Sequence, residues 1–174
     1  DRAVAGLADM RAAWAKAGQS ADTLNAVAWA GGAVLADGEP ADSPRAIAQA
    51  GPRTMVLLHR AADAALDGHP APAPLPPQFQ SAVDGYVAHA RSFRPQGAAY
   101  LHNHRGHLMF VRPDERPFLS ADLIKYATWT APEKELRNRI GAIADAGFSQ
   151  IVFSILPGQE HAIEDWGRIR AAFA

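Results

Sequence analysis

The change between strand-like and helical spacing of apolar residues is clearest from Leu123 to Trp166. Residues 123–129 are rich in β-forming side chains and predict a strand. Residues 151–156 are almost continuously apolar, as expected for a strand covered on both faces. Between them, apolar residues recur at helical spacing: Leu136, Ile140, Ile143 and Ala144. The stretch therefore predicts two parallel strands joined by a helix.

The helix between these strands carries start and stop signals. Thr130 and Glu133 have the spacing of a capping box, and Pro132 lies in the first turn, where its missing N–H costs little. Gly147 is suited to end the helix. After Pro157-Gly158, residues 160–173 predict a closing helix.

The first part of the chain predicts a helix, a strand and a further helical pair. Residues 2–17 form an amphipathic pattern. Residues 24–36 predict a buried strand interrupted by Gly31-Gly32, a pair typical of a bulge or of a close approach by another group. Ser43-Pro44 predicts a helix start. Gly51-Pro52 predicts that this helix stops or kinks, with a second helix over residues 52–66.

The middle of the chain begins with a proline-rich connector at residues 68–77, which cannot be a helix or an inner strand. A further amphipathic helix is predicted over residues 79–93. Helices and strands alternate along the 174 residues, which favours a single domain of the α/β class with a parallel sheet. About three strands with many surrounding helices fit the C-terminal portion of a larger (β/α)8 barrel, and the N-terminus has the character of a cut edge.

Charge and composition exclude several classes of function. The net charge is −1 and the 17 basic residues are scattered, so neither a nucleic-acid partner nor an anionic membrane surface is expected. The chain has no cysteine, which excludes disulfides and cysteine nucleophiles and fits a cytoplasmic location. No apolar run approaches the roughly 20 residues needed to span a bilayer.

Three of the seven histidines lie close together in the segment YLHNHRGHLMF: His102, His104 and His107, with Arg105 among them. If residues 101–105 are extended, His102 and His104 point to the same face. Three imidazoles could bind a metal, but a fourth ligand is not evident and no metal is assigned. A polar pocket wall that contacts a substrate is favoured, and a surface loop whose histidines cap helix ends is the other alternative.

The carboxyl ends of the predicted strands offer a second candidate site, because ligands of parallel α/β folds bind there. Trp129 could stack on a planar ligand or fill the core. Thr130 could bind an anion or only cap the helix. The chain contains no dinucleotide fingerprint, P-loop or nucleophile elbow.

The segment from Ala127 to Trp166 resembles the C-terminal end of the bacterial luciferase-like flavin-dependent oxidoreductases. The resemblance rests on a Thr-Pro-like turn that opens a helix, an Ala-Gly pair that closes it, and a buried strand that ends in Pro-Gly. Residues 26–52 and the YLHNHRGHL patch are similar to the subgroup described as methylene-tetrahydromethanopterin-reductase-like proteins.

This resemblance implies the C-terminal half of a (β/α)8 barrel that transfers hydride through FMN or a deazaflavin (coenzyme F-420). Gly31, Gly32, Trp129 and Thr130 would then approach the cofactor. His102, His104, Arg105 and His107 would line the substrate side. The resemblance assigns no catalytic residue.

The expected partners are a small-molecule substrate and either a second copy of the chain or an N-terminal half. Two other functions stay open. One is a metal-dependent hydrolase that uses the three histidines, and the other is a non-catalytic association fragment whose open strand edges pair with another chain.

Overall fold

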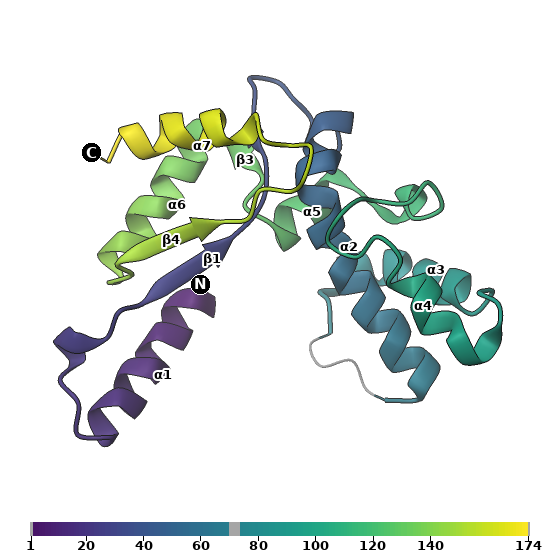
Figure 1. Cartoon of the computed structure of the whole chain (residues 1–174), viewed down its shortest axis with the longest axis horizontal. Helices are drawn as coiled ribbons and strands as arrows, with labels where there is room; N and C mark the ends of the chain where they lie inside the picture. Colours follow the sequence, from purple (N-terminus) through teal and green to yellow (C-terminus); the bar gives the residue numbers. More distant parts are fainter. Residues whose placement is uncertain (1, 70–73, 174) are drawn as a thin grey trace.

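The computed structural model describes residues 2–69 and 74–173 and has a mixed α/β architecture (Figure 1). Short 3-10 turns connect several of its elements. The described helices are α1 (Arg2–Lys16), α2 (Pro44–Asp67), α3 (Gln80–Ala90), α4 (Ala99–Asn103), α5 (Ala121–Ala127), α6 (Glu133–Asp145) and α7 (Ala162–Ala171). The described strands are β1 (Val27–Ala30), β2 (Val34–Leu35), β3 (Ala131–Pro132) and β4 (Gln150–Phe153).

The strands form two parallel pairs, which confirms the α/β class. β1 pairs with β4, and β2 pairs with β3. The backbone also links the pairs, because the carbonyl of Ala30 accepts from Ser154 while that of Gly31 accepts from Trp129. Successive carbonyls of a strand point to opposite edges, so the β1–β2 segment lies between β4 and β3. Within residues 2–69 and 74–173 there is no closed barrel, and the consecutive strands β3 and β4 do not pair.

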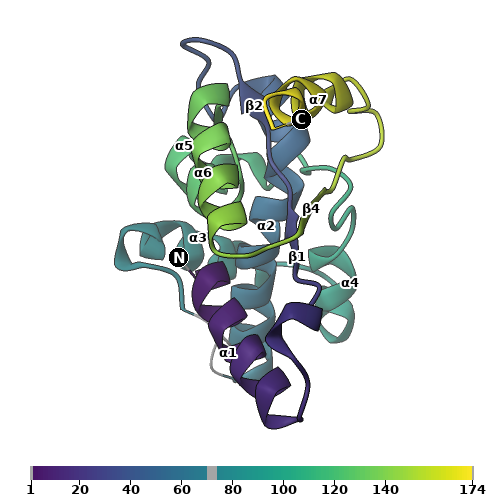
Figure 2. The same ribbon diagram turned by 90° about the vertical axis from the view of Figure 1, so that its left-hand side faces the viewer.

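The apolar core is divided into two clusters. The larger one lies among α2, α3, α4 and α5, and the smaller one lies between the strands and helices α6 and α7. Figure 1 shows these groups on opposite sides of the molecule, and Figure 2 shows α1 extending away from both. β2 serves both clusters, because Val34 points into the smaller core and its neighbour Leu35 into the larger one.

Several predicted elements are confirmed. Helices α1, α3, α6 and α7 and strand β1 lie within the ranges expected for them, and β4 overlaps its expected range but begins one residue earlier and ends three residues earlier. Ser43 caps α2 by accepting a hydrogen bond from the backbone N–H of Ala46, at 3.1 Å. Gly147 follows α6 with a left-handed φ of 100°. Of the proline-rich segment 68–77, residues 70–73 lie outside the described residues.

The strand predicted over residues 123–129 is wrong, because this segment forms helix α5. Ser120 caps it by accepting a hydrogen bond from the backbone N–H of Leu123. Leu123 and Ile124 are completely buried in the larger core. Burial of this pair against the other helices therefore overrides the local preference for a strand.

The predicted capping box is also wrong. Helix α6 begins at Glu133, and no side chain caps it. The hydroxyl of Thr130 instead accepts a hydrogen bond from the backbone N–H of Ala33, at 3.2 Å, and pairs with the hydroxyl of Thr128, at 2.7 Å. Thr130 thus joins β3 to the turn before β2.

The predicted stop at Gly51-Pro52 does not occur and no separate second helix begins at residue 52, because α2 runs without interruption from Pro44 to Asp67. Both residues of the pair are buried. A Cβ atom on Gly51 would lie 2.7 Å from a methyl carbon of Val111. Close packing on this side therefore offsets the hydrogen bond that Pro52 cannot donate.

Strand β4 is not covered on both faces, contrary to the prediction. Ile151 and Phe153 face α6 and α7, where the Phe153 ring stacks on Trp166 with centroids 3.8 Å apart. The opposite face carries Val27, Trp29 and Val152, whose exposed fractions are 45%, 70% and 43%. A parallel sheet is normally buried on both faces, so this open apolar face is unusual.

Candidate functional site

Chemically useful side chains gather in two places. One is the carboxyl end of β1 and its surroundings, and the other is a polar cluster between α2 and the segment after α4. Helix α2 contributes to both, because it carries Arg53 at the first and His59 at the second. The two positions are six residues apart along the helix, which corresponds to a rise of about 9 Å.

The glycine pair after β1 is explained by the protein's own close contacts. A Cβ atom on Gly31 would lie 2.7 Å from Nε of Arg53, and one on Gly32 would lie 2.4 Å from the backbone carbonyl of Trp129. Gly31 therefore makes room for a side chain, and Gly32 makes room for the approach to β3. This confirms the close approach expected from the sequence.

The two other residues expected near a cofactor differ in their access to solvent. Thr130 is completely buried and uses its hydroxyl within the fold. Trp129 is half-buried and meets Phe153 edge-on, with centroids 6.2 Å apart. Trp129 also lines a hollow of about 470 Å³ between α1 and the open sheet face, together with Val27, Trp29 and Met10.

Arg53 and Trp29 are functional candidates that the sequence did not reveal. The guanidinium carbon of Arg53 lies 5.0 Å from the centre of the exposed Trp29 ring. No acidic side chain is paired with Arg53 in the described part of the chain, and burial lowers its pKa. Arg53 lies on α2, 22 positions after Gly31, so no local sequence pattern connects the two residues.

The histidine segment is not extended. Residues 99–103 form α4, and a turn follows. The expectation that His102 and His104 share a face through strand alternation is therefore wrong. The His102 ring packs on Phe93, with centroids 4.1 Å apart, and its Nε2 lies 3.9 Å from Asp114. His102 is thus directed away from the other histidines of the segment.

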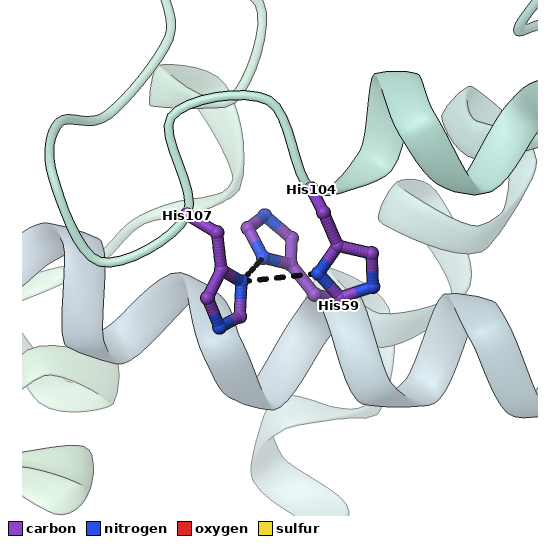
Figure 3. Close-up of side chains that lie close together, drawn as sticks. All are labelled: His59, His104 and His107. Atoms are coloured by element: carbon purple, nitrogen blue, oxygen red, sulfur yellow. Dashed lines mark hydrogen bonds between the residues drawn. The ribbon is translucent and has the colours of Figure 1, made fainter.

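His104 and His107 instead meet His59, which lies far from them in the sequence (Figure 3). Nδ1 of His107 lies 3.1 Å from Nδ1 of His59 and 3.2 Å from Nδ1 of His104. Gly106, with a φ of 78°, turns the chain so that His107 returns toward His104. The three rings come from α2, the end of α4 and the following turn. Arg105 is exposed, and its carbonyl accepts from Arg112.

Two of these imidazoles contact carboxylates through the ring nitrogen that faces away from the cluster. Nε2 of His59 lies 2.7 Å from Glu115, and Nε2 of His104 lies 2.7 Å from Asp63. Because a carboxylate accepts hydrogen bonds, these contacts favour a proton on each Nε2 atom. Burial and the two neighbouring imidazoles lower the pKa of His107 and favour its neutral form.

Glu115 belongs to a deeply buried polar network. Its carboxylate lies 3.0 Å from the guanidinium of Arg112, and both side chains are almost completely buried. Arg112 donates to the carbonyls of His102 and Asn103, at 2.9 and 3.2 Å. The Tyr86 hydroxyl donates to Asn103, at 2.9 Å. Burial raises the pKa of Tyr86, followed in effect by the charge of Glu115.

The network determines the charge of its two carboxylates. Burial alone would raise the pKa of Glu115, but hydrogen bonds from His59 and the backbone N–H of Arg112 lower it overall. Asp114 behaves in the same way, because hydrogen bonds from His89 and Arg112 outweigh burial and lower its pKa to about 2. Both groups are therefore anionic at neutral pH.

No protein-family model, curated protein or solved structure matches this chain. In the part of the chain that the structure describes, no helix is long and apolar enough to cross a membrane.

Proposed function

We propose that the chain forms part of a flavin-dependent oxidoreductase of the luciferase-like class and helps to bind FMN or coenzyme F-420 at the carboxyl end of β1. The observation that carries the proposal is the pair of Arg53 and Trp29 beside Gly31. A half-buried guanidinium without an acidic partner suits a phosphate, and an exposed indole suits a planar ring. FMN and F-420 combine both features.

Other observations support this placement. The described strands are parallel, and ligands of parallel sheets bind beyond the carboxyl ends of the strands. The sequence of residues 127–166 resembles the luciferase-like class independently of these contacts. Of the residues first expected at the cofactor, Trp129 fits a direct contact. Gly31 and Gly32 fit an indirect role, because they make room for Arg53 and β3.

The cofactor would supply hydride transfer, and this chain would orient it and exclude water. Trp29 and Trp129 offer apolar surface on one side of the sheet, while Arg53 offers positive charge. His104, His107 and Arg105 lie on the segment expected at the substrate side. We assign no proton transfer to them. A cytoplasmic location and a small-molecule substrate remain predictions.

We also expect further elements of the same fold to cover the open face of Val27, Trp29 and Val152, since parallel sheets are normally buried on both faces. A barrel with its strands in chain order would require β3 and β4 to be neighbours, whereas β1 and β2 lie between them. Flavin binding does not depend on barrel closure, since open parallel sheets bind ligands at the same strand ends.

Titration of the purified protein with FMN and with F-420, followed by fluorescence, tests the proposal. Loss of a charge-assisted contact to phosphate should make Arg53→Ala bind FMN about 10- to 100-fold more weakly. Riboflavin, which lacks the phosphate, should bind equally to both proteins. Arg60→Ala, which removes an exposed charge from the same helix, should bind FMN normally. Failure of both flavins to bind, or an equal effect on riboflavin, would contradict the proposal.

The open sheet face favours a second function, association with another copy of the chain. Three large apolar side chains on neighbouring strands are exposed there, and such faces tend to be covered by a partner. Sedimentation should then show a dimer, and Val152→Lys should give a monomer. A monomer at every concentration of the unaltered protein would exclude this function.

A further inference from the structure

We propose that His59, His104 and His107 bind a divalent transition-metal ion, with zinc as the type case, through three imidazole nitrogens and with a fourth position left for water or a substrate. The proposal does not rest on flavin binding. It also differs from the set expected from the sequence, because His59 takes the place of His102.

The spacing of the nitrogens fits a tetrahedral ion. One ring nitrogen from each of the three side chains lies within 4.8 Å of the others. Zinc binds histidine nitrogen at about 2.0–2.1 Å, so two ligands of a tetrahedron lie about 3.3 Å apart. The Nδ1 atom of His107 lies 3.1 Å from that of His59 and 3.2 Å from that of His104. A small adjustment of the rings is enough to admit the ion.

The positions of the protons give a second reason. Hydrogen bonds to Glu115 and Asp63 favour Nε2 protonation of His59 and His104, so their Nδ1 atoms present lone pairs. Both lone pairs point at Nδ1 of His107 (Figure 3). That atom carries at most one proton, which can be directed at only one of them. A cation satisfies all three nitrogens at once.

The supporting contacts are those that metal-binding histidines use. Such histidines usually donate their other ring N–H to a carboxylate or carbonyl, which fixes the ring and strengthens the ligand. Glu115 does this for His59 and is itself held by Arg112 at 3.0 Å. Asp63 does it for His104 and also accepts from Asn103, at 2.6 Å. The site is thus anchored to the buried network.

Access and charge are suitable for an ion. The side chain of His104 is 40% exposed, so the cluster opens to solvent, whereas His59 is only 3% exposed. The negative charge of Asp63 favours a cation, while Arg60 nearby opposes it. Three imidazole nitrogen ligands select zinc, cobalt or nickel over magnesium and calcium, which prefer oxygen ligands.

Metal titration of the untagged protein tests the site. After dialysis against a chelator, zinc should bind with one ion per chain, and cobalt should give the visible absorbance of a tetrahedral complex. His107→Ala, which removes a half-buried ligand, should weaken zinc binding by at least about 100-fold, and Asp63→Asn should weaken it by about 10-fold. Circular dichroism should show that both variants are folded.

His102→Ala provides the matched control, because His102 belongs to the same segment but packs on Phe93. It should bind zinc like the unaltered protein. The proposal is overturned if zinc does not bind, if His107→Ala binds it normally, or if His102→Ala is equally impaired. None of these readouts involves flavin, so the two proposals can fail separately.

Discussion

The helical part of the molecule and the strand part treat their polar and apolar groups in opposite ways. Among α2 to α5, Arg112 is completely buried and has carboxylate and carbonyl partners on several sides. At the sheet, Arg53 is half-buried and has no acidic partner among the residues that the structure describes, and Trp29 is 70% exposed. In the helical part, the buried polar groups have partners within the protein. In the strand part, Arg53 and Trp29 could still contact a ligand or a covering element.

The two parts therefore have different roles: the helical part is rigid, and the sheet part has surface free to bind a ligand or partner. A buried network whose members all have partners holds side chains in one arrangement, which suits a preorganised metal site. An exposed apolar face contributes little to the stability of the fold until a ligand, another element or a partner removes it from water. The helical part should therefore respond strongly to substitutions in the free protein. The sheet face should respond mainly when a ligand or partner is present.

The largest effect is expected for Glu115→Ala. Removing this carboxylate leaves the buried charge of Arg112 without its closest counterion and His59 without its acceptor. The free energy of unfolding should fall by about 3–5 kcal/mol. Urea unfolding followed by circular dichroism measures the change. Glu135→Ala, which removes an exposed ion pair with Arg139, should lower the free energy of unfolding by less than about 0.5 kcal/mol. Equal decreases for the two variants would contradict the stabilising role of the buried network.

A smaller effect distinguishes the two adjacent glycines of the strand part. A methyl group at Gly32 would press against the backbone of Trp129, which cannot move without disturbing β3. Gly32→Ala should therefore cost about 2–3 kcal/mol. Gly31→Ala meets only the side chain of Arg53, so its cost should be about 1 kcal/mol. Thermal unfolding of the two variants decides the order, and a larger loss for Gly31→Ala would contradict it.

The two faces of β4 provide the next comparison. Phe153 stacks on Trp166, so Phe153→Ala should cost about 2 kcal/mol. Its neighbour Val152 is 43% exposed on the open face, and Val152→Ala should cost less than about 0.5 kcal/mol. Urea unfolding measures both. A cost above about 1.5 kcal/mol at Val152 would show that the face is covered in the protein.

The elements with strong periodic signals were predictable. The spacing of apolar residues predicted α6, and Gly147 predicted its end. Ser43-Pro44 predicted the start of α2. The strand predicted at residues 123–129 failed because Leu123 and Ile124 are buried among helices that are distant in the sequence. Local composition contains no information about that environment.

The candidate sites were predictable only where their residues are adjacent in the chain. His104 and His107 were found as members of one segment, but His59 lies 45 and 48 positions earlier, and only the fold brings it to them. His102 was wrongly grouped because α4 is helical rather than extended. Arg53 was missed because its contacts, Gly31 and Trp29, lie 22 and 24 positions earlier in the chain, and only the fold brings them together.

An effect smaller than those at Glu115, Gly32 and Phe153 is expected where the two parts join. Arg45 of α2 donates to the carbonyl of Val34, at 2.7 Å, and lies 3.4 Å from Asp165 of α7. It also pairs with Glu39. The hydrogen bond from Arg45 is the main cause that lowers the pKa of Glu39 from 4.5 to about 2, against the effect of burial. This residue therefore makes the stability of the joint depend on pH.

Because the folded-state pKa of Glu39 is depressed, its contribution is present above pH 4.5 and is lost as the pH falls toward about 2. Glu39→Gln keeps the shape but removes the charge. It should lower the free energy of unfolding by about 1 kcal/mol near neutral pH, since Arg45 is one-third exposed and solvent screens the pair. Urea unfolding at a series of pH values should show the difference between the two proteins shrinking as the pH falls from 4.5 to about 2. A constant difference at every pH would mean that the charge of Glu39 does not stabilise the joint.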